Sequence, residues 1–179
     1  MAAKDINALY GMFLPTKEGR IVGEEGLLTD KPHGEWKRKV SLVKESSYGN
    51  WSHLEIDIGG SKISGYHFPT WKDHAEAEIE IVAAMIEAIF IEMHGKSNPI
   101  IVSNCRAGVG RTGTLLTALH FYQMIQRGEE DPSKYTLEAI VVVINEFREK
   151  RGEAQFVQTG GQFIMLCMLI QKFYNQKFS

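Results

Sequence analysis

The sequence predicts an α/β domain with a twisted mixed central sheet flanked by helices. The order of its segments (strands, a helix, a strand and then helices) indicates this class. Three early segments alternate apolar and polar residues, as half-buried strands do. Four later segments repeat apolar residues with the period of an amphipathic helix. A chain of 179 residues fits one domain, since domains usually contain about 100–200 residues.

The strand-like segments cover residues 39–44, 52–58 and 62–68. Gly59 and Gly60 separate the last two and form a turn signal typical of a β-hairpin. Residues 1–34 contain only short apolar patches and are expected to form a lead-in that packs on the core. No linker or repeat divides the chain, so a single domain is expected over residues 1–179.

The helical period first appears between residues 74 and 93, where apolar residues form one stripe. That stripe consists of Ile79, Val82, Ile86, Ile89 and Met93. Residues 100–103 are a short apolar run after Pro99, which predicts a buried strand. Further helices are expected at about 111–127, 133–150 and 157–173.

Composition argues against several classes of protein. The formal net charge of −2 disfavours a nucleic-acid partner, because such proteins usually carry a basic excess. The apolar run at 163–170 is too short for a membrane span, which requires about 20 residues. The two cysteines, Cys105 and Cys167, make no disulfide framework, which favours a reducing compartment such as the cytoplasm. Cys167 shares an apolar helical stripe with Phe163 and Ile170 and is expected in the core.

The candidate functional residues begin where the expected strand at 100–103 ends. Cys105 follows this strand, and Arg111 follows Cys105 by six positions, with glycines between them. A cysteine at a helix N-terminus faces free N–H groups and the positive end of the dipole. Its pKa is therefore expected to fall from about 8.5 toward about 3.5–7.5.

The same loop is suited to binding a phosphate dianion. Successive backbone N–H groups hold such an anion, and Gly108 and Gly110 let the backbone curl without Cβ clashes. The planar guanidinium of Arg111 can bind two phosphoryl oxygens at once. The segment therefore predicts phosphate-ester chemistry with Cys105 as the nucleophile.

Three other interpretations are weaker. Cys105 could be a buried structural thiol, but it adjoins charged and glycine residues instead of an apolar stripe. Residues 108–113 match the dinucleotide pattern GxGxxG, yet a helix and not a parallel strand is expected after Asp131. The nucleotide P-loop pattern requires a lysine that this segment lacks.

The loop resembles the signature of the cysteine-dependent protein tyrosine phosphatase family, HCxxGxxR followed by Ser or Thr. Cys105, Gly108, Arg111 and Thr112 match this signature. The resemblance implies that Cys105 attacks phosphorus, that Arg111 binds the phosphoryl group and that Thr112 steadies the departing thiolate. It also implies a phosphate-binding loop formed by Arg106, Ala107, Gly108, Val109, Gly110 and Arg111.

Residues 66–74 resemble a second element of this family, the mobile acid loop Trp-Pro-Asp. By this match Asp73 is the general acid that protonates the leaving tyrosine oxygen. An alternative is that Asp73 and Glu76 form a capping box for the next helix. The two roles can coexist.

Residues 155–162 resemble a third element, Val-Gln-Thr-x-x-Gln. The resemblance implies that Gln158 positions the water that hydrolyses the phosphocysteine, and that Gln162 assists in substrate binding. The expected function is hydrolysis of phosphotyrosine in a protein substrate through a phosphocysteine intermediate, with no metal or cofactor. Compact domains of this type also resemble those of bacterial effectors delivered into host cells.

The sequence departs from the family pattern at two positions. Asn104 replaces the signature histidine, so a less depressed pKa of Cys105 is expected than in relatives. Lys72 replaces the acid-loop proline, which favours an altered open–closed balance and a lower turnover. A tyrosine-bearing recognition loop is not found, so a dual-specificity or phosphoinositide phosphatase stays open. A pseudophosphatase that binds phosphotyrosine without hydrolysing it is the third possibility.

Overall fold

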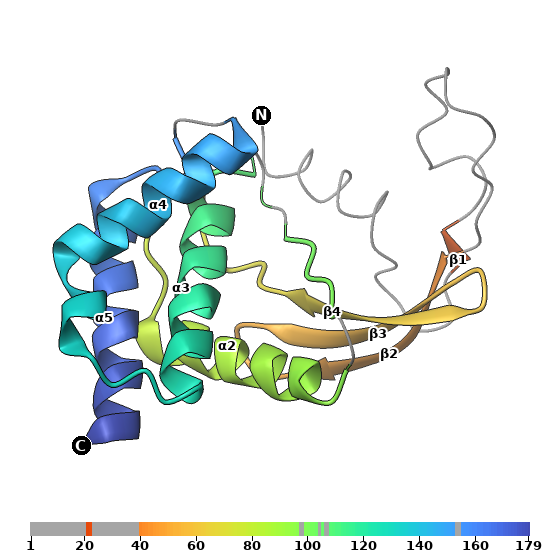
Figure 1. Ribbon diagram of the computed structural model, residues 1–179. Coiled ribbons are helices and arrows are strands. Elements are labelled where there is room, and N and C mark those ends of the chain that lie inside the picture. Colours follow the sequence, from red (N-terminus) through yellow and green to blue (C-terminus); the bar gives the residue numbers. More distant parts are fainter. Residues whose placement is uncertain (1–20, 23–39, 97–98, 104, 106–107, 153–154) are drawn as a thin grey trace. The chain divides into compact units, whose positions relative to one another are not determined.

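The computed structural model describes residues 21–22, 40–96, 99–103, 105, 108–152 and 155–179. The chain divides into two compact units, Met1–Pro69 and Thr70–Ser179 (Figure 1). The described part of the first unit forms a β-sheet, and that of the second is helical. This combination confirms the predicted α/β class.

The sheet of the first unit has the strand order β1-β2-β3-β4. Its strands are β1 (Ile21–Val22), β2 (Val40–Ser47), β3 (Ser52–Ile58) and β4 (Ser61–His67). Between β3 and β4 the chain reverses at Gly59 and Gly60, which have φ angles of 60° and 89° that glycine adopts without strain. The carboxylate of Asp57 accepts a hydrogen bond from the Gly60 N–H at 2.9 Å and closes the turn.

The three strands and the hairpin expected from the alternating pattern are confirmed. Alternation also predicts the small core of this sheet, which consists of Leu42, Leu54 and Ile56 with Ile58 packed beside them. Every pairing among the described strands is antiparallel, whereas a mixed sheet was expected. Of the expected lead-in at 1–34, only β1 is described, and it pairs with β2; the rest lies outside the described residues.

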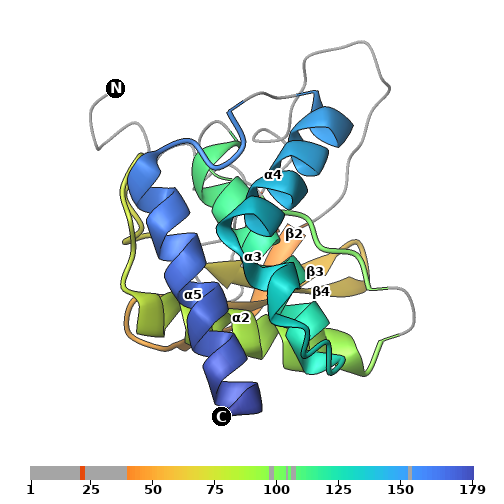
Figure 2. The ribbon, with the colours of Figure 1, turned by 60° about the vertical axis from the view of Figure 1, so that its left-hand side comes forward.

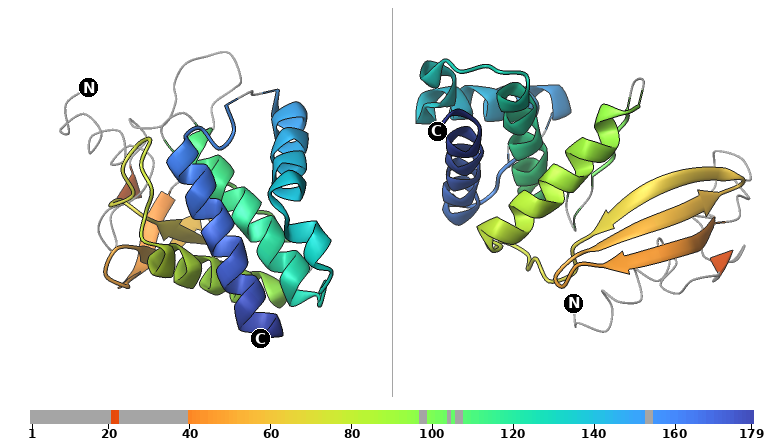
Figure 3. Two further views of the ribbon diagram at one scale, coloured as in Figure 1. Left: turned by 90° about the vertical axis from the view of Figure 1, so that its left-hand side faces the viewer. Right: turned by 90° about the horizontal axis from the view of Figure 1, so that it is seen from below.

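The second unit contains the helices. They are α2 (Ile79–His94), α3 (Gly110–Gln126), the short 3₁₀ helix η1 (Pro132–Tyr135), α4 (Leu137–Arg151) and α5 (Gly160–Phe178). Helix α3 packs along α5 and also contacts α2 and α4 (Figures 2 and 3). None of the helices among the described residues is long and apolar enough to cross a membrane.

Aromatic side chains connect α2, α3 and α5. Tyr122 of α3 meets Phe173 of α5 edge-on, with ring centroids 4.5 Å apart, and meets Phe90 of α2 at 5.1 Å. Edge-to-face pairs of this kind contribute about 0.5–1.5 kcal/mol beyond the burial of their surface. The largest fully buried side chains around them include Phe121, Ile125, Leu166 and Ile170. These contacts hold α2, α3 and α5 together, and the candidate site lies at the N-termini of α3 and α5.

Two expectations about this unit are wrong. The first helix begins at Ile79 and not at residue 74, and no side chain caps it, so Asp73 and Glu76 form no capping box there. Residues 100–103 form no strand, and Ile100 and Val102 are each 88% exposed. A strand requires a neighbouring strand to accept and donate its backbone hydrogen bonds. The described part of the second unit offers no such neighbour to residues 100–103.

Cys167 was expected in the core but is half-buried on α5, while Ile170 of the same stripe is fully buried. Burial raises the pKa of the Cys167 thiol. A thiol of raised pKa is a poor nucleophile at neutral pH, which separates Cys167 from Cys105.

Candidate active site

Cys105 is half-buried and precedes α3, whose first residue is Gly110. Burial acts to raise the pKa of Cys105. The Thr112 hydroxyl, the backbone N–H groups of Thr112 and Gly108, and the charge of Arg111 act to lower that pKa. The lowering effects are stronger in sum, so the pKa of Cys105 lies below that of an ordinary thiol. The direction agrees with the expectation for a cysteine at a helix N-terminus.

The backbone of the loop before α3 adopts a conformation that its glycines were expected to permit. Gly108 has a φ of 71°, a conformation that strains residues with a side chain. A Cβ at this position would also lie 2.7 Å from Nη2 of Arg151. A guanidinium group from the end of α4 therefore lies against the loop. No pattern in the sequence indicated a link between Arg151 and Gly108.

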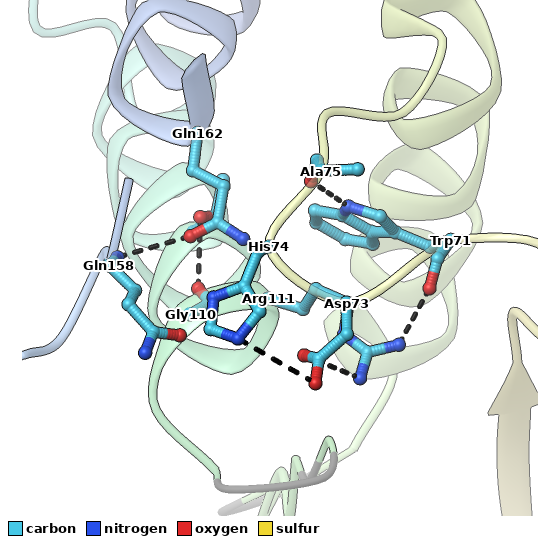
Figure 4. A network of polar contacts seen from close by, with 9 residues as sticks. Trp71, Asp73, His74, Ala75, Gly110, Arg111, Gln158 and Gln162 are labelled. Carbon is cyan, nitrogen blue, oxygen red and sulfur yellow. Dashed lines mark hydrogen bonds and ion pairs between the residues drawn. The ribbon is translucent and has the colours of Figure 1, made fainter. Parts of the chain in front are cut away.

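Arg111 is bound to the segment of residues 70–78, which we call the acid segment (Figure 4). Its Nη1 donates to the carbonyl oxygen of Trp71 at 2.6 Å. Its Nη2 donates to Oδ1 of Asp73 at 3.1 Å, forming an ion pair. The Nε of Arg111 is buried without a hydrogen-bond partner among the described residues. The arginine thus joins the N-terminus of α3 to the predicted general acid.

The acid segment is a compact turn held by its own contacts. Trp71 is 4% exposed, and its indole N–H donates to the Ala75 carbonyl at 2.9 Å. The Ala75 N–H donates to the Lys72 carbonyl at 3.3 Å. His74 has a φ of 59°, and its Nε2 lies 3.9 Å from Oδ2 of Asp73. The turn therefore presents Asp73 between Arg111 and His74 (Figure 4).

The two glutamines converge on the first residue of α3. A Cβ at Gly110 would lie 2.9 Å from Oε1 of Gln162 and 3.0 Å from Oε1 of Gln158. The Gln158 N–H donates to Oε1 of Gln162 at 3.1 Å. Gln162 is completely buried, and its Nε2 has no hydrogen-bond partner among the described residues. The Gln162 amide therefore offers a buried hydrogen-bond donor beside the first residue of α3.

A strained residue places Gln158 in this position. Val157 has a φ of 58°, which is unusual for a β-branched side chain and typical of functional segments. Its N–H donates to the carbonyl of Val109 at 3.3 Å, and the same carbonyl accepts from the Gly113 N–H at 2.9 Å. Arg148 of α4 donates to the Phe156 carbonyl at 3.0 Å and holds the segment from the other side. The cysteine loop and the glutamine segment are therefore tied through their backbones.

The structure brings together most of the predicted site residues within the second unit. They are Asp73, Cys105, Gly108, Val109, Gly110, Arg111, Thr112, Gln158 and Gln162. Arg106 and Ala107, predicted to bind phosphate, and Asn104 lie outside the described residues. Two contacts were not foreseen, Arg151 against Gly108 and Glu76 against Gly161. Both join residues far apart in sequence, so no local pattern could reveal them.

The arrangement has a definite chemical capacity. A thiol of lowered pKa precedes a helix N-terminus beside a guanidinium group, which suits attack on an anionic centre. A carboxylate lies within hydrogen-bonding reach of that guanidinium and is available for proton transfer. Among the described residues, no group of three His, Cys, Asp or Glu side chains is arranged to hold a metal ion.

Curated relatives are tyrosine phosphatases from several organisms. Tyrosine-protein phosphatase 1 of Saccharomyces cerevisiae is 30% identical over 111 residues, which are 56% of this chain and 32% of that protein. Tyrosine-protein phosphatase 69D of Drosophila melanogaster is 29% identical over 144 residues, 71% of this chain and 9% of that protein. Receptor-type tyrosine-protein phosphatase H of Homo sapiens is 27% identical over 148 residues, 77% of this chain and 12% of that protein.

The chain spans about a third of the length of the yeast relative and about a tenth of the other two. The family model described as Protein-tyrosine phosphatase matches residues 33–172, well over half of the chain. The matched region includes the acid segment, the cysteine loop and the glutamine segment. The chain therefore belongs to the protein-tyrosine phosphatase family.

Proposed function

We propose that this chain is a protein tyrosine phosphatase that hydrolyses phosphotyrosine through a phosphocysteine intermediate. The observation that carries the proposal is the lowered pKa of Cys105 beside Arg111, which in turn is bonded to Asp73. Family membership and the names of the relatives give further support. The two free thiols are consistent with a reducing, cytoplasmic compartment, which we include in the proposal together with the predicted role as a delivered effector.

In the first step, the Cys105 thiolate attacks phosphorus and a sulfur–phosphorus bond forms. The bond between phosphorus and the tyrosine oxygen breaks, and the protonated Asp73 gives its proton to that oxygen. The guanidinium of Arg111 binds two phosphoryl oxygens, and the backbone N–H groups of residues 106–110 bind the remaining charge. Arg111 must exchange its carboxylate partner for the phosphoryl group as substrate enters.

In the second step, a water molecule attacks the phosphocysteine. Asp73, now ionised, takes the proton of this water, and Gln158 orients it with the help of Gln162. The sulfur–phosphorus bond breaks and the Cys105 thiolate leaves. The Thr112 hydroxyl, which acts to lower the pKa of this thiol, stabilises the leaving sulfur. Inorganic phosphate is released and Asp73 is again protonated.

The proposal is tested by phosphate release from a phosphotyrosine peptide. A phosphoserine peptide and a phosphoinositide serve as alternative substrates, and Cys105→Ser removes the nucleophile. We expect release from phosphotyrosine that depends on Cys105, with little from the other two. Faster release from the phosphoinositide would replace the proposed substrate, and tight binding without release would indicate a pseudophosphatase.

A further inference from the structure

We propose that Glu76 is a positioning residue that holds the acid segment against the N-terminus of α5 and so keeps Asp73 in place for proton transfer. This inference rests on the proposed phosphatase function. It concerns a contact made by this chain's own residues, Glu76 and Gly161, which lie 85 positions apart in the sequence.

The contact is defined by the missing side chain of Gly161. A Cβ at Gly161 would overlap Oε1 of Glu76 and would lie 3.1 Å from its Cγ. The carboxylate of Glu76 therefore occupies the space where any other residue at position 161 would carry its side chain. Gly161 is the second residue of α5, so the carboxylate lies at the first turn of that helix.

A carboxylate is favoured at this place for an electrostatic reason. The first turn of a helix carries free N–H groups and a partial positive charge, and a nearby anion contributes about 0.3–1 kcal/mol. Thr159 already caps α5 by accepting from the Gln162 N–H at 3.2 Å. Glu76 adds a full negative charge to the same helix end and links it to the acid segment.

A second bond joins the acid segment to the same helix. The Ala77 N–H donates to the sulfur of Met165 at 3.1 Å. Neighbouring residues of the segment therefore both rest on α5, one through its side chain and one through its backbone. Glu76 follows Asp73 by three positions, so the freedom of Asp73 depends on where Glu76 is held.

The importance of this contact increases when substrate binds. In the structure, Asp73 is held by its ion pair with Arg111. A phosphoryl group that binds Arg111 takes this partner away from Asp73. The contacts with α5 then remain to keep the acid segment over the reacting group, and Glu76 is the charged one among them.

Variants of both partners test this role on two aryl phosphates. Phenyl phosphate has a poor leaving group that requires a proton from Asp73, whereas 2,4-dinitrophenyl phosphate has a good one that leaves without it. The value of kcat/KM is compared because it reports phosphoryl transfer to Cys105 and not the later hydrolysis. Positioned general acids contribute about 10²–10⁴-fold to such steps, so partial misplacement is expected to cost about tenfold.

We expect Glu76→Ala to lower kcat/KM about tenfold for phenyl phosphate and less than about twofold for dinitrophenyl phosphate, as partial loss of a general acid requires. Glu76→Gln keeps the shape of the side chain without its charge. Its kcat/KM for phenyl phosphate is expected to lie between that of the parent and that of Glu76→Ala. Gly161→Ala displaces the carboxylate and is expected to resemble Glu76→Ala. The double variant, Glu76→Ala with Gly161→Ala, is expected to have a kcat/KM no lower than that of Glu76→Ala. Without the Glu76 carboxylate, a Cβ at position 161 has nothing to clash with.

Glu78→Ala is the matched control, since Glu78 is exposed in the same segment and its side chain makes no cap bond to α2. Equal losses on both substrates, or additive losses in the double variant, would overturn the positioning role. If the parent releases phosphate in a Cys105-dependent way and the Glu76 variants match it, only this inference fails. If the parent releases no phosphate from either substrate, the proposed function fails and the inference with it.

Discussion

Nη2 of Arg111 lies 3.1 Å from Oδ1 of Asp73, so the predicted phosphate-binding residue and the predicted general acid are ion-paired. The Asp73 side chain is 36% exposed, and exposed pairs of this kind contribute only about 0–1 kcal/mol. A dianionic phosphoryl group can therefore replace the carboxylate at small cost. The pair holds both residues near their working positions and does not block the site.

Arg111→Lys is expected to abolish most of the activity. The arginine binds the Trp71 carbonyl and the Asp73 carboxylate through two different nitrogens, which the single ammonium of lysine cannot do in the same geometry. Loss of one aligned donor to a developing anion costs about 10²–10³-fold in kcat. Steady-state kinetics with a phosphotyrosine peptide measure this loss, and thermal unfolding of the variant checks that it folds. A loss smaller than about tenfold would contradict the assigned role of Arg111.

Thr112→Val is expected to raise the pKa of Cys105. The Thr112 hydroxyl and backbone N–H lower the pKa of this thiol in the folded protein, and valine removes the hydroxyl at similar volume. A higher pKa leaves less thiolate at a given pH, so the acidic limb of activity moves to higher pH. The pH dependence of Cys105 alkylation by iodoacetamide measures the shift directly.

Thr117→Val provides the control for this substitution. Thr117 is also buried in α3, and its hydroxyl, like that of Thr112, has no closely aligned hydrogen-bond partner among the described residues. It is not among the groups that influence the pKa of Cys105. An alkylation midpoint that moves equally in both variants, or in neither, would show that the Thr112 hydroxyl does not act on the thiol.

Asn104→His is expected to shift the same profile in the opposite direction. Asn104 lies outside the described residues, so this prediction rests on the sequence, where the family signature has histidine. A protonated imidazole beside the thiolate favours ionisation, and the pKa of Cys105 is expected to fall. The acidic limb of kcat/KM then moves to lower pH. An unchanged pH–rate profile would remove the explanation offered for Asn104.

Sequence patterns predicted those elements of the fold that are determined by residues close together in the chain. Alternation predicted the β3–β4 hairpin to within one residue, and the helical period predicted a helix at about 111–127, where α3 runs from Gly110 to Gln126. The start of α2 was misplaced because residues 75–78, Ala-Glu-Ala-Glu, favour a helix by their intrinsic propensity but belong to the acid segment instead. The run at 100–103 is apolar enough for a strand, but strand formation depends on a partner that local sequence does not specify.

In the candidate site, too, only the features set by neighbouring residues could be predicted from the sequence. The residue types of the site follow from short motifs, whereas the contacts between different motifs join distant positions, as with Asp73 and Arg111, which are 38 positions apart. The convergence of Gln158 and Gln162 on Gly110 likewise depends on how α3 and α5 pack. The strained backbone of Val157 is imposed by that packing, since isolated valine avoids positive φ.

Lys72→Pro is expected to increase turnover. The carbonyl of Lys72 accepts from the Ala75 N–H, and its side chain is exposed, so the turn needs its backbone and not its charge. Proline at a compatible position limits the open conformations and stabilises the ordered one by about 0.4–1 kcal/mol, or about two- to fivefold in population. Single-turnover kinetics measure the rate of phosphoryl transfer to Cys105. No change in that rate would remove the argument that Lys72 weakens closure.

Gly113→Ala is expected to destabilise the fold near the site. A Cβ at Gly113 would lie 2.5 Å from the backbone nitrogen of Val157 and 3.0 Å from Cγ of Phe156. Val157 already has a strained φ of 58° and is bonded to the Val109 carbonyl, so its backbone has little freedom to move away. Inserting a methyl group into such packing costs about 1–3 kcal/mol. Urea unfolding measures the change in the free energy of unfolding.

Gly160→Ala is the matched control for that measurement. Gly160 is the first residue of α5, and a Cβ there would meet nothing within 4 Å. Alanine favours the helix over glycine by up to about 1 kcal/mol in helix interiors, so this variant is expected to be at least as stable as the parent. Of the two variants, only Gly113→Ala is expected to lose activity as well as stability. The added methyl group displaces Val157, which moves Gln158 away from Gly110. If both alanine variants unfold at the same urea concentration as the parent, close packing of α3 against the glutamine segment does not position the site.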